Sequence, residues 1–209
     1  VGCAPAQKPL TDYVNPMLGT ATLWDSVDLG FKPTKRTWGA EVFPGSSLPN
    51  AMVQVSPVTK FHSGAGYQYE DSVIYGFTHT NKGHWNLCHI PLLPVTGTPT
   101  PGDYCSPFSH ERESAAPGYY QVFLDRYGVD AQLSSTLRCA FHKYTYPAGA
   151  AASLLADLQR SNEHVRAWDI RKEGDNVFAG WQQTGEKMYF YAVANRPVTG
   201  IEPVVEGDR

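Results

Sequence analysis

The residues from Tyr119 to His142 constrain the fold of this chain most narrowly, because apolar and polar side chains alternate along them. Tyr119 to Leu124 forms one alternating run, Asp125 to Gly128 supplies turn residues, and a second run begins at Val129. One phase of the second run holds Val129, Ala131, Leu133, Leu137, Cys139 and Phe141, and His142 falls on the other. A period of two is typical of a sheet with one buried face. We therefore expect a strand pair, with Cys139 buried and His142 on the polar face.

Similar short runs recur along the chain and indicate an all-β fold with little helix. We expect strands at residues 11–20 with a turn at Gly19, at 52–55, at 73–77 and at 90–95, and a hairpin from 177–181 and 188–194. The 209 residues include 19 Gly, 16 Pro and 12% aromatic side chains, which favours many short strands joined by turns. The expected architecture is one large antiparallel β-sandwich over residues 11–209.

Charge and cysteine content argue against several functional classes. The formal net charge is −3 and no long basic run occurs, so nucleic acid and anionic membrane surfaces are poor candidates for partners. No apolar run approaches the roughly 20 residues that span a bilayer. Apart from Cys3 the chain has Cys88, Cys105 and Cys139, which allow at most one internal disulfide, and no CxxC spacing suggests zinc.

The stretch from Gly66 to Pro94 is the strongest candidate for a functional region. It places three histidines, four tyrosine or tryptophan rings and several glycines between two β-type runs. Residues 79–86 read as a loop that offers hydrogen-bond donors, acceptors and one flat ring, which is the mixture that a sugar's hydroxyl groups and C–H face require.

An ordered series of motifs resembles the amino-terminal domain of family 92 glycoside hydrolases, the exo-acting α-mannosidases. The motifs are Asn15–Thr20, Phe43–Gly45, Met52–Pro57, Ile74–Thr80, Ser109–Glu111, Ala116–Tyr120 and Phe141–Pro147, and the resemblance covers most of residues 13–197. It implies a β-sandwich of the supersandwich type. It also implies that residues 150–158 form a strand, although their alanines and leucines have high helix propensity.

The same resemblance implies where the chemistry of the parent enzyme lies. Inverting family members take both catalytic carboxyl groups and the ligands of a calcium ion from a helical barrel, a domain absent from this chain, so no catalytic or metal-binding residue is assigned here. The amino-terminal domain supplies one wall of the terminal-mannose subsite of an α-1,2-mannosidase type of enzyme. First candidates for substrate binding are His79, Gly83, His84 and Trp85, and second candidates are Trp38 and Gly39. The expected partners are a mannose-containing glycan and the barrel.

Other interpretations of these residues stay open. Trp85 could cap the end of the sandwich and Trp38 could fold onto the core, because tryptophan is usually largely buried. The family usually has a glycine- and threonine-rich loop where this chain has residues 82–87, which leaves the linkage and the sugar open. A carbohydrate-binding or structural module without hydrolysis is the alternative function.

Two further motifs carry less weight. Ser109, His110 and Glu111 are adjacent, and neighbouring residues of an extended chain point to opposite faces, so they cannot form a catalytic triad by themselves. The histidines at 79, 84 and 89 recur every five residues, which matches neither one helix face nor one strand face, so a metal site is the least favoured interpretation.

The first ten residues form a separate expected segment. Val1-Gly2-Cys3 resembles the end of a bacterial lipoprotein signal, after which Cys3 would carry a lipid and residues 1–10 would act as a tether. This predicts a secreted, periplasmic or cell-surface lipoprotein. The alternative is an ordinary cysteine near an arbitrary boundary of the sequence.

Overall fold

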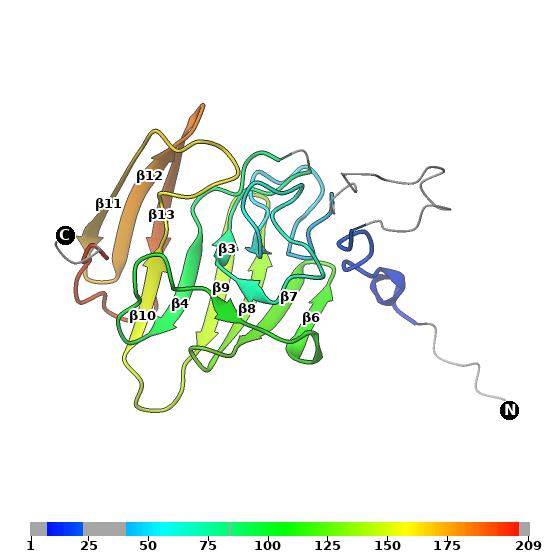
Figure 1. Ribbon diagram of the computed structural model, residues 1–209, viewed down its shortest axis with the longest axis horizontal. Coiled ribbons are helices and arrows are strands. Elements are labelled where there is room, and N and C mark those ends of the chain that lie inside the picture. Colours follow the sequence, from blue (N-terminus) through cyan, green and yellow to red (C-terminus); the bar gives the residue numbers. More distant parts are fainter. Residues whose placement is uncertain (1–7, 23–40, 84, 205–209) are drawn as a thin grey trace, which may run out of the picture.

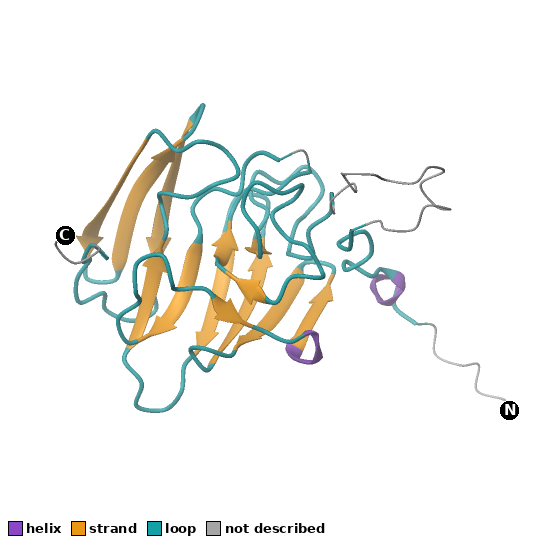
Figure 2. Ribbon diagram, in the orientation of Figure 1, coloured by secondary structure: helices purple, strands orange, loops and turns teal. Residues whose placement is uncertain are grey.

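The computed structural model describes residues 8–22, 41–83 and 85–204. The expectations for Cys3, Trp38, Gly39 and His84 lie outside these residues. Within them the fold is all-β, as expected, and its antiparallel sheets are joined by long loops (Figure 2). None of the helices described has the length and hydropathy needed to cross a membrane.

One layer of the sandwich is a four-stranded antiparallel sheet. It consists of β6 (Glu113–Ala116), β7 (Tyr119–Leu124), β8 (Val129–Ser135) and β9 (Ala140–Thr145) in that order (Figure 1). Alternate residues of β7 and β8 are fully buried, as the period-two pattern predicts. The predicted strand pair and the turn over residues 125–128 are therefore confirmed.

The prediction that the alternating run from Val129 to His142 is one strand was wrong, because a tight turn divides these residues into two strands. β8 ends at Ser135, and Thr136 receives a hydrogen bond from Cys139 N on its side-chain oxygen (3.0 Å). Ser135 pairs with Ala140, so odd-numbered residues face inward on β8 and even-numbered ones on β9. Phe141 is consequently 61% exposed and Cys139 is exposed, while His142 points inward beside Leu133, so the expected burial of Cys139 and the polar-face position of His142 were wrong.

The facing layer is a second four-stranded antiparallel sheet, ordered β1 (Ser56–Val58), β3 (Gly76–Thr78), β4 (Leu92–Thr96) and β10 (Ala152–Ala156). A two-stranded pair, β2 (Val73–Ile74) with β5 (Ser106–Pro107), accompanies it. One core cluster joins the layers, with Phe77, Leu93 and Val95 from this sheet against Tyr120 and Leu133 from the other. Burial of these side chains, worth roughly 1.5–3 kcal/mol each, holds the layers together.

Three local expectations had different outcomes. β10 is a strand despite its helix propensity, because β4 provides a ladder partner along its whole length. The predicted strand at residues 52–55 was wrong: Val55 forms only an isolated bridge with Ser46, the residues before it are irregular, and the strand begins at Ser56 and includes Pro57. The predicted strand after Thr11 was also wrong, since η1 (Leu10–Tyr13) is a 3-10 helix, whereas Gly19 does lie in a turn with φ 86°.

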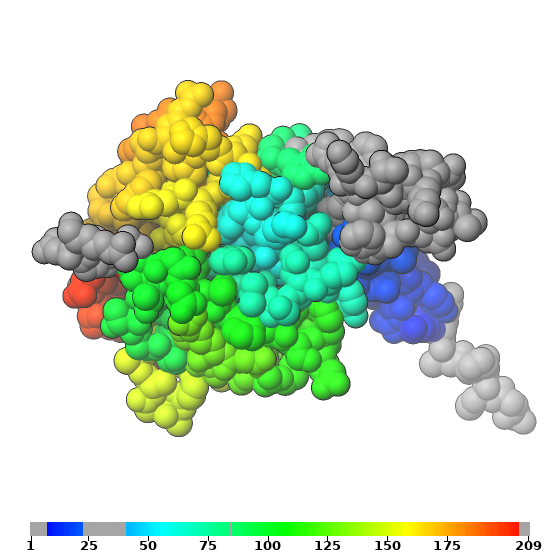
Figure 3. Space-filling view, viewed as in Figure 1, coloured from blue at the N-terminus to red at the C-terminus, as the bar shows by residue number. Residues whose placement is uncertain are grey.

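A three-stranded meander stands beside the sandwich and forms the yellow-to-orange lobe in Figure 3. It contains β11 (Ala167–Gly174), β12 (Val177–Gln183) and β13 (Lys187–Val193), which confirms the predicted hairpin. Phe190 packs inward against Ile90, Leu92 and Leu158. Its neighbours Tyr189 and Tyr191 are 72% and 66% exposed, so the meander presents an aromatic outer face.

Candidate functional site

The loop of residues 79–91, between β3 and β4, lies at one end of the sandwich, the upper end in Figure 1. Phe77 pairs with Leu92 at its base. Two further backbone hydrogen bonds continue this pairing into the loop, from His79 N to His89 O (3.0 Å) and from Cys88 N to Thr80 O (2.7 Å). The tip over residues 81–87 is thereby fixed at both ends.

The backbone of this loop is unusually strained. Trp85, Leu87, Cys88 and Ile90 have φ values from 55° to 63°, a left-handed conformation that L-residues other than glycine rarely adopt. In the described part of the chain only Asn50 and His62 share it among the non-glycine residues. Strain of about 1–3 kcal/mol per residue persists only where the surroundings enforce it, and it is often found at functional sites.

Asn162, which follows β10, enforces part of this conformation. Its backbone N–H donates to Leu87 O (3.0 Å), its side-chain amide donates to Ser63 O (2.9 Å), and its amide oxygen accepts from His62 N (2.8 Å). Trp85 N donates to Gly64 O (3.0 Å). The loop tip is thus clamped by residues 62–64 on one side and by residue 162 on the other.

A buried polar network fixes the second half of the loop to the meander. The ring of His89 contacts Thr80 Oγ1 (2.8 Å) through Nδ1 and Thr184 Oγ1 (3.0 Å) through Nε2, and Thr184 donates to Glu163 (2.9 Å). Burial lowers the pKa of His89, and the nearby Glu163 carboxylate opposes that shift. Gln182 accepts a hydrogen bond from Ile90 N (2.8 Å). The ring of His89 therefore bridges the loop and the meander inside the protein.

His79 heads a second buried chain of hydrogen bonds. Its Nδ1 donates to Ile90 O (2.8 Å), so its Nε2 accepts from His142 Nε2 (3.0 Å), and His142 Nδ1 accepts from the hydroxyl of Tyr144 (2.7 Å). Burial lowers the pKa of His79 to about 4 and that of His142 well below its ordinary value. Both nitrogens of each ring are used within the protein.

The predicted site residues have different environments. Trp85 is half-buried, and Gly83 lies so close to Glu41 that a β-carbon there would be 2.7 Å from a carboxylate oxygen. A larger residue at position 83 would therefore require the side chain of Glu41 to move. His79 is directed inward, and His84, Trp38 and Gly39 lie outside the described residues. The structure brings Gly83 and Trp85 into one loop with Glu41 beside it.

Cys88 and the Ser109 motif have structural roles. Cys88 is fully buried, and burial raises its pKa to about 12, which makes its thiol a poor nucleophile. Ser109 accepts a hydrogen bond from Glu111 N, and His110 Nδ1 instead contacts the buried carboxylate of Glu113 (2.5 Å). The three adjacent residues form no triad, as predicted. The described residues contain no group of three or more His, Cys, Asp or Glu side chains arranged to hold a metal ion.

Sequence reasoning missed the residues that hold the loop. Glu41, Asn162, Glu163, Gln182 and Thr184 come from three distant segments, and no local motif marks them. Thr184 and His89, for instance, are 95 residues apart. Only a strand register that places the end of β12 beside the loop could have identified these contacts.

The described residues thus form an antiparallel β-sandwich that carries a rigid loop with an indole ring at one end. The family described as Glycosyl hydrolase family 92 N-terminal domain matches residues 13–208. The chain belongs to this family.

Solved structures agree with this assignment. The GH92 α-mannosidase BT3965 from Bacteroides thetaiotaomicron superposes with a TM-score of 0.79 and 26% identity over 92% of this chain. The GH92 glycosyl hydrolase ccman5 gives 0.69 and 25% over 90%. This chain covers 26% of each of those chains, about a quarter of their length. A search of curated proteins gives no match.

Proposed function

We propose that this domain forms one wall of the terminal-sugar subsite of an exo-acting α-mannosidase of the α-1,2 type. The observation that carries the proposal is the strained loop, in which Trp85, Leu87, Cys88 and Ile90 are held in a left-handed conformation by distant partners. Such a loop costs stability, and a rigid loop contributes to binding because its ordering is complete before the ligand arrives. BT3965 has also been solved in complex with mannoimidazole, which supports a mannose-like ligand.

In this proposal each loop residue has a distinct role. Trp85 offers ring surface to the C–H face of the sugar, and His84 donates or accepts a hydrogen bond with a hydroxyl group. Gly83 allows the chain to approach Glu41 closely. Trp38 and Gly39 form the second part of the wall. His79 acts through the loop rather than on the sugar, because both nitrogens of its ring are engaged inside the protein.

The catalytic groups are proposed to lie in the helical barrel that accompanies this domain in the complete enzyme. Inverting hydrolysis needs a carboxylic acid to protonate the leaving oxygen and a carboxylate to activate water, with the two carboxyl groups roughly 6.5–9.5 Å apart. The barrel would also hold the calcium ion.

The outer face of the meander supports a partner domain over a module that acts alone. Tyr189, Tyr191 and Val193 lie two residues apart on β13 with 65% or more of each side chain exposed. They therefore form a continuous apolar stripe, and such surfaces mark interaction sites. The barrel is the proposed occupant.

Calorimetric titration with methyl α-mannoside and α-1,2-mannobiose tests this function. We expect Trp85→Ala to leave any heat of binding by the isolated chain unchanged, and to lower kcat/KM of the complete enzyme by about 10-fold or more, which is at least about 1.4 kcal/mol. Trp168→Ala, at an exposed position of β11, is the matched control. Binding by the isolated chain that Trp85→Ala abolishes would instead support the stand-alone carbohydrate-binding module.

A further inference from the structure

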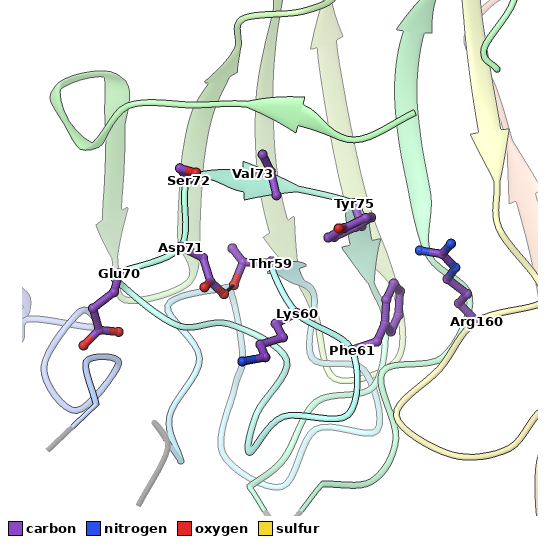
Figure 4. Close-up of a pocket in the computed structure, with 9 residues that line it drawn as sticks. All are labelled: Thr59, Lys60, Phe61, Glu70, Asp71, Ser72, Val73, Tyr75 and Arg160. Carbon is purple, nitrogen blue, oxygen red and sulfur yellow. Dashed lines mark hydrogen bonds between the residues drawn. The ribbon is translucent and has the colours of Figure 1, made fainter. Parts of the chain in front are cut away.

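A hollow of about 500 Å³ opens beside the sandwich at residues that the proposed wall does not use. It is lined by residues 59–61, which follow β1, by residues 70–73 and Tyr75 around β2, and by Arg160 after β10 (Figure 4). Its volume falls within the range of ordinary small-molecule sites. The polarity and charge of the side chains that line the hollow indicate which kind of ligand it could bind.

One side of the hollow is aromatic. Phe61 and Tyr75 lie with ring centroids 6.0 Å apart at 56°, and Figure 4 shows both rings on the same side as Arg160. The guanidinium carbon of Arg160 is 5.6 Å from the Tyr75 centroid, and its Nε is 3.5 Å from Asp157 Oδ2. Because that carboxylate partly neutralises Arg160, this side presents ring surface and little net charge.

The other side carries polar groups that are free to bind a ligand. Asp71 accepts from Thr59 Oγ1 through Oδ2 (2.7 Å), the interaction dashed in Figure 4, and this contact fixes the carboxylate. Among the described residues, Asp71 Oδ1, Lys60 Nζ and the hydroxyl groups of Ser72 and Tyr75 have no hydrogen-bond partner. The hollow thus offers at least one acceptor, one cationic donor and two hydroxyl groups, and among them the Asp71 carboxylate is held in place by Thr59.

The charges of the lining argue against an ionic ligand. Lys60 and Arg160 are matched by Glu70 and Asp71, and Asp157 adds a further negative charge beside Arg160. A phosphate or sulfate would therefore find no excess of positive charge, and a cation would meet Lys60 and Arg160. A neutral molecule with one apolar face and many hydroxyl groups fits both sides.

We propose that this hollow is a second saccharide-binding site, which takes a neutral hexopyranose unit. The C–H face of the sugar lies on Phe61 and Tyr75, and its hydroxyl groups bind Asp71, Lys60 and Ser72. The site is independent of the proposed mannosidase function, because none of its groups belongs to the loop that carries Trp85. A glycan held here would be anchored to the domain by a unit other than the one at the terminal-sugar subsite.

The test is a titration of the ¹⁵N-labelled 209-residue chain with methyl α-mannopyranoside, followed by amide chemical shifts. We expect saturable shifts at residues 60–61 and 70–75. Phe61→Ala should weaken this binding at least 10-fold, and Lys60→Ala, at an exposed and unpaired position, should weaken it severalfold without changing the fold. Lys172→Ala on β11 is the control and should bind like the unchanged chain.

Trp85→Ala separates this site from the proposed subsite, because it should leave the shifts at residues 60–75 unchanged. The proposal would be overturned if residues 60–75 showed no saturable shifts or if the shifts were confined to residues 79–90. It would also be overturned if Phe61→Ala bound the sugar as well as the unchanged chain. Tighter binding of mannose 6-phosphate than of the neutral glycoside would overturn the argument from charge. Saturable binding of methyl α-glucoside at the same amides would agree with a site for neutral hexoses in general.

Discussion

The β7–β8 hairpin and the loop between β3 and β4 show opposite relations to local sequence. In the hairpin, alternating side chains predict the strands, and Gly128 takes the left-handed conformation with φ 63°. In the loop, Trp85, Leu87 and Ile90 take nearly the same φ without being glycine, and contacts from distant segments compensate. The conformation of the hairpin follows from its own residues, whereas the conformation of the loop depends on contacts with distant parts of the domain. Backbone strain that distant contacts maintain is a reason to look for function in this loop.

The largest expected effect tests the sheet that contains the β7–β8 hairpin. Leu133→Ala removes a fully buried side chain between the layers and should lower the free energy of unfolding by about 2–5 kcal/mol. Phe141→Ala, on the neighbouring strand but facing outward, should change it by less than about 0.5 kcal/mol. Urea denaturation measures both, and equal losses would contradict the reversed phase of β9.

Acid should weaken the loop region more than its surroundings. A histidine whose pKa is lower in the folded state than its unfolded value of about 6.5 binds more protons when unfolded, so its contribution to stability is complete above pH 6.5 and is lost as the pH falls. For His79 the window runs from about 6.5 down to about 4. We expect a loss of about 1–3 kcal/mol between pH 7.5 and 5.

Two variants sharpen this pH test. His142→Gln removes a second group with a lowered pKa and should flatten the dependence of the unfolding free energy on pH. His164→Gln, at an exposed position, is the matched control. A slope that is the same with and without His142 would show that this residue binds protons equally in the folded and unfolded states, which would contradict its lowered pKa.

A substitution at Asn162 should loosen the loop of residues 79–91 without changing any residue of that loop. Asn162→Ala leaves His62 N without its partner and removes the donor to Ser63, which should cost about 1–3 kcal/mol. Hydrogen exchange should rise at residues 62–66 and 85–89 and stay unchanged in β7 and β8. Asn176→Ala, which loses a single bond to Ala194 O, is the matched control and should cost less. Uniform exchange across the domain would contradict the clamp.

The smallest expected effect concerns the β7–β8 turn, in which a glycine takes the left-handed conformation. Gly128→Ala places a β-carbon 3.0 Å from Pro147 Cγ at a positive φ and should cost about 1–2 kcal/mol. Gly185→Ala, where no atom lies within 4 Å, should stay within about 0.5 kcal/mol of the unchanged chain. Thermal unfolding followed by circular dichroism can compare the two.

Prediction from sequence succeeded where neighbours along the chain decide the structure. The alternation in β7 and β8 and the β12–β13 hairpin were predicted in this way, whereas the strand β10 was predicted from the family resemblance and against its local helix propensity. It failed at residues 136–139, because Thr-Leu-Arg-Cys contains none of the Gly, Pro or Asn residues that usually mark a turn. It failed again at β1, which contains Pro57. The loop was located from its histidines, rings and glycines, but its supports could not be, because they approach only after the sheets have formed.

The turn at residues 136–139 sets a length requirement that is uncommon for an exposed loop. Because this turn determines which side chains of β9 face inward, deleting or inserting one residue would turn His142 outward and bring Phe141 or Lys143 toward His79. Exposed turns ordinarily tolerate changes in length. In this domain a change in the length of an exposed turn would change which side chains of β9 are buried. Homologous chains that keep the paired histidines are therefore expected to keep the length of this turn as well.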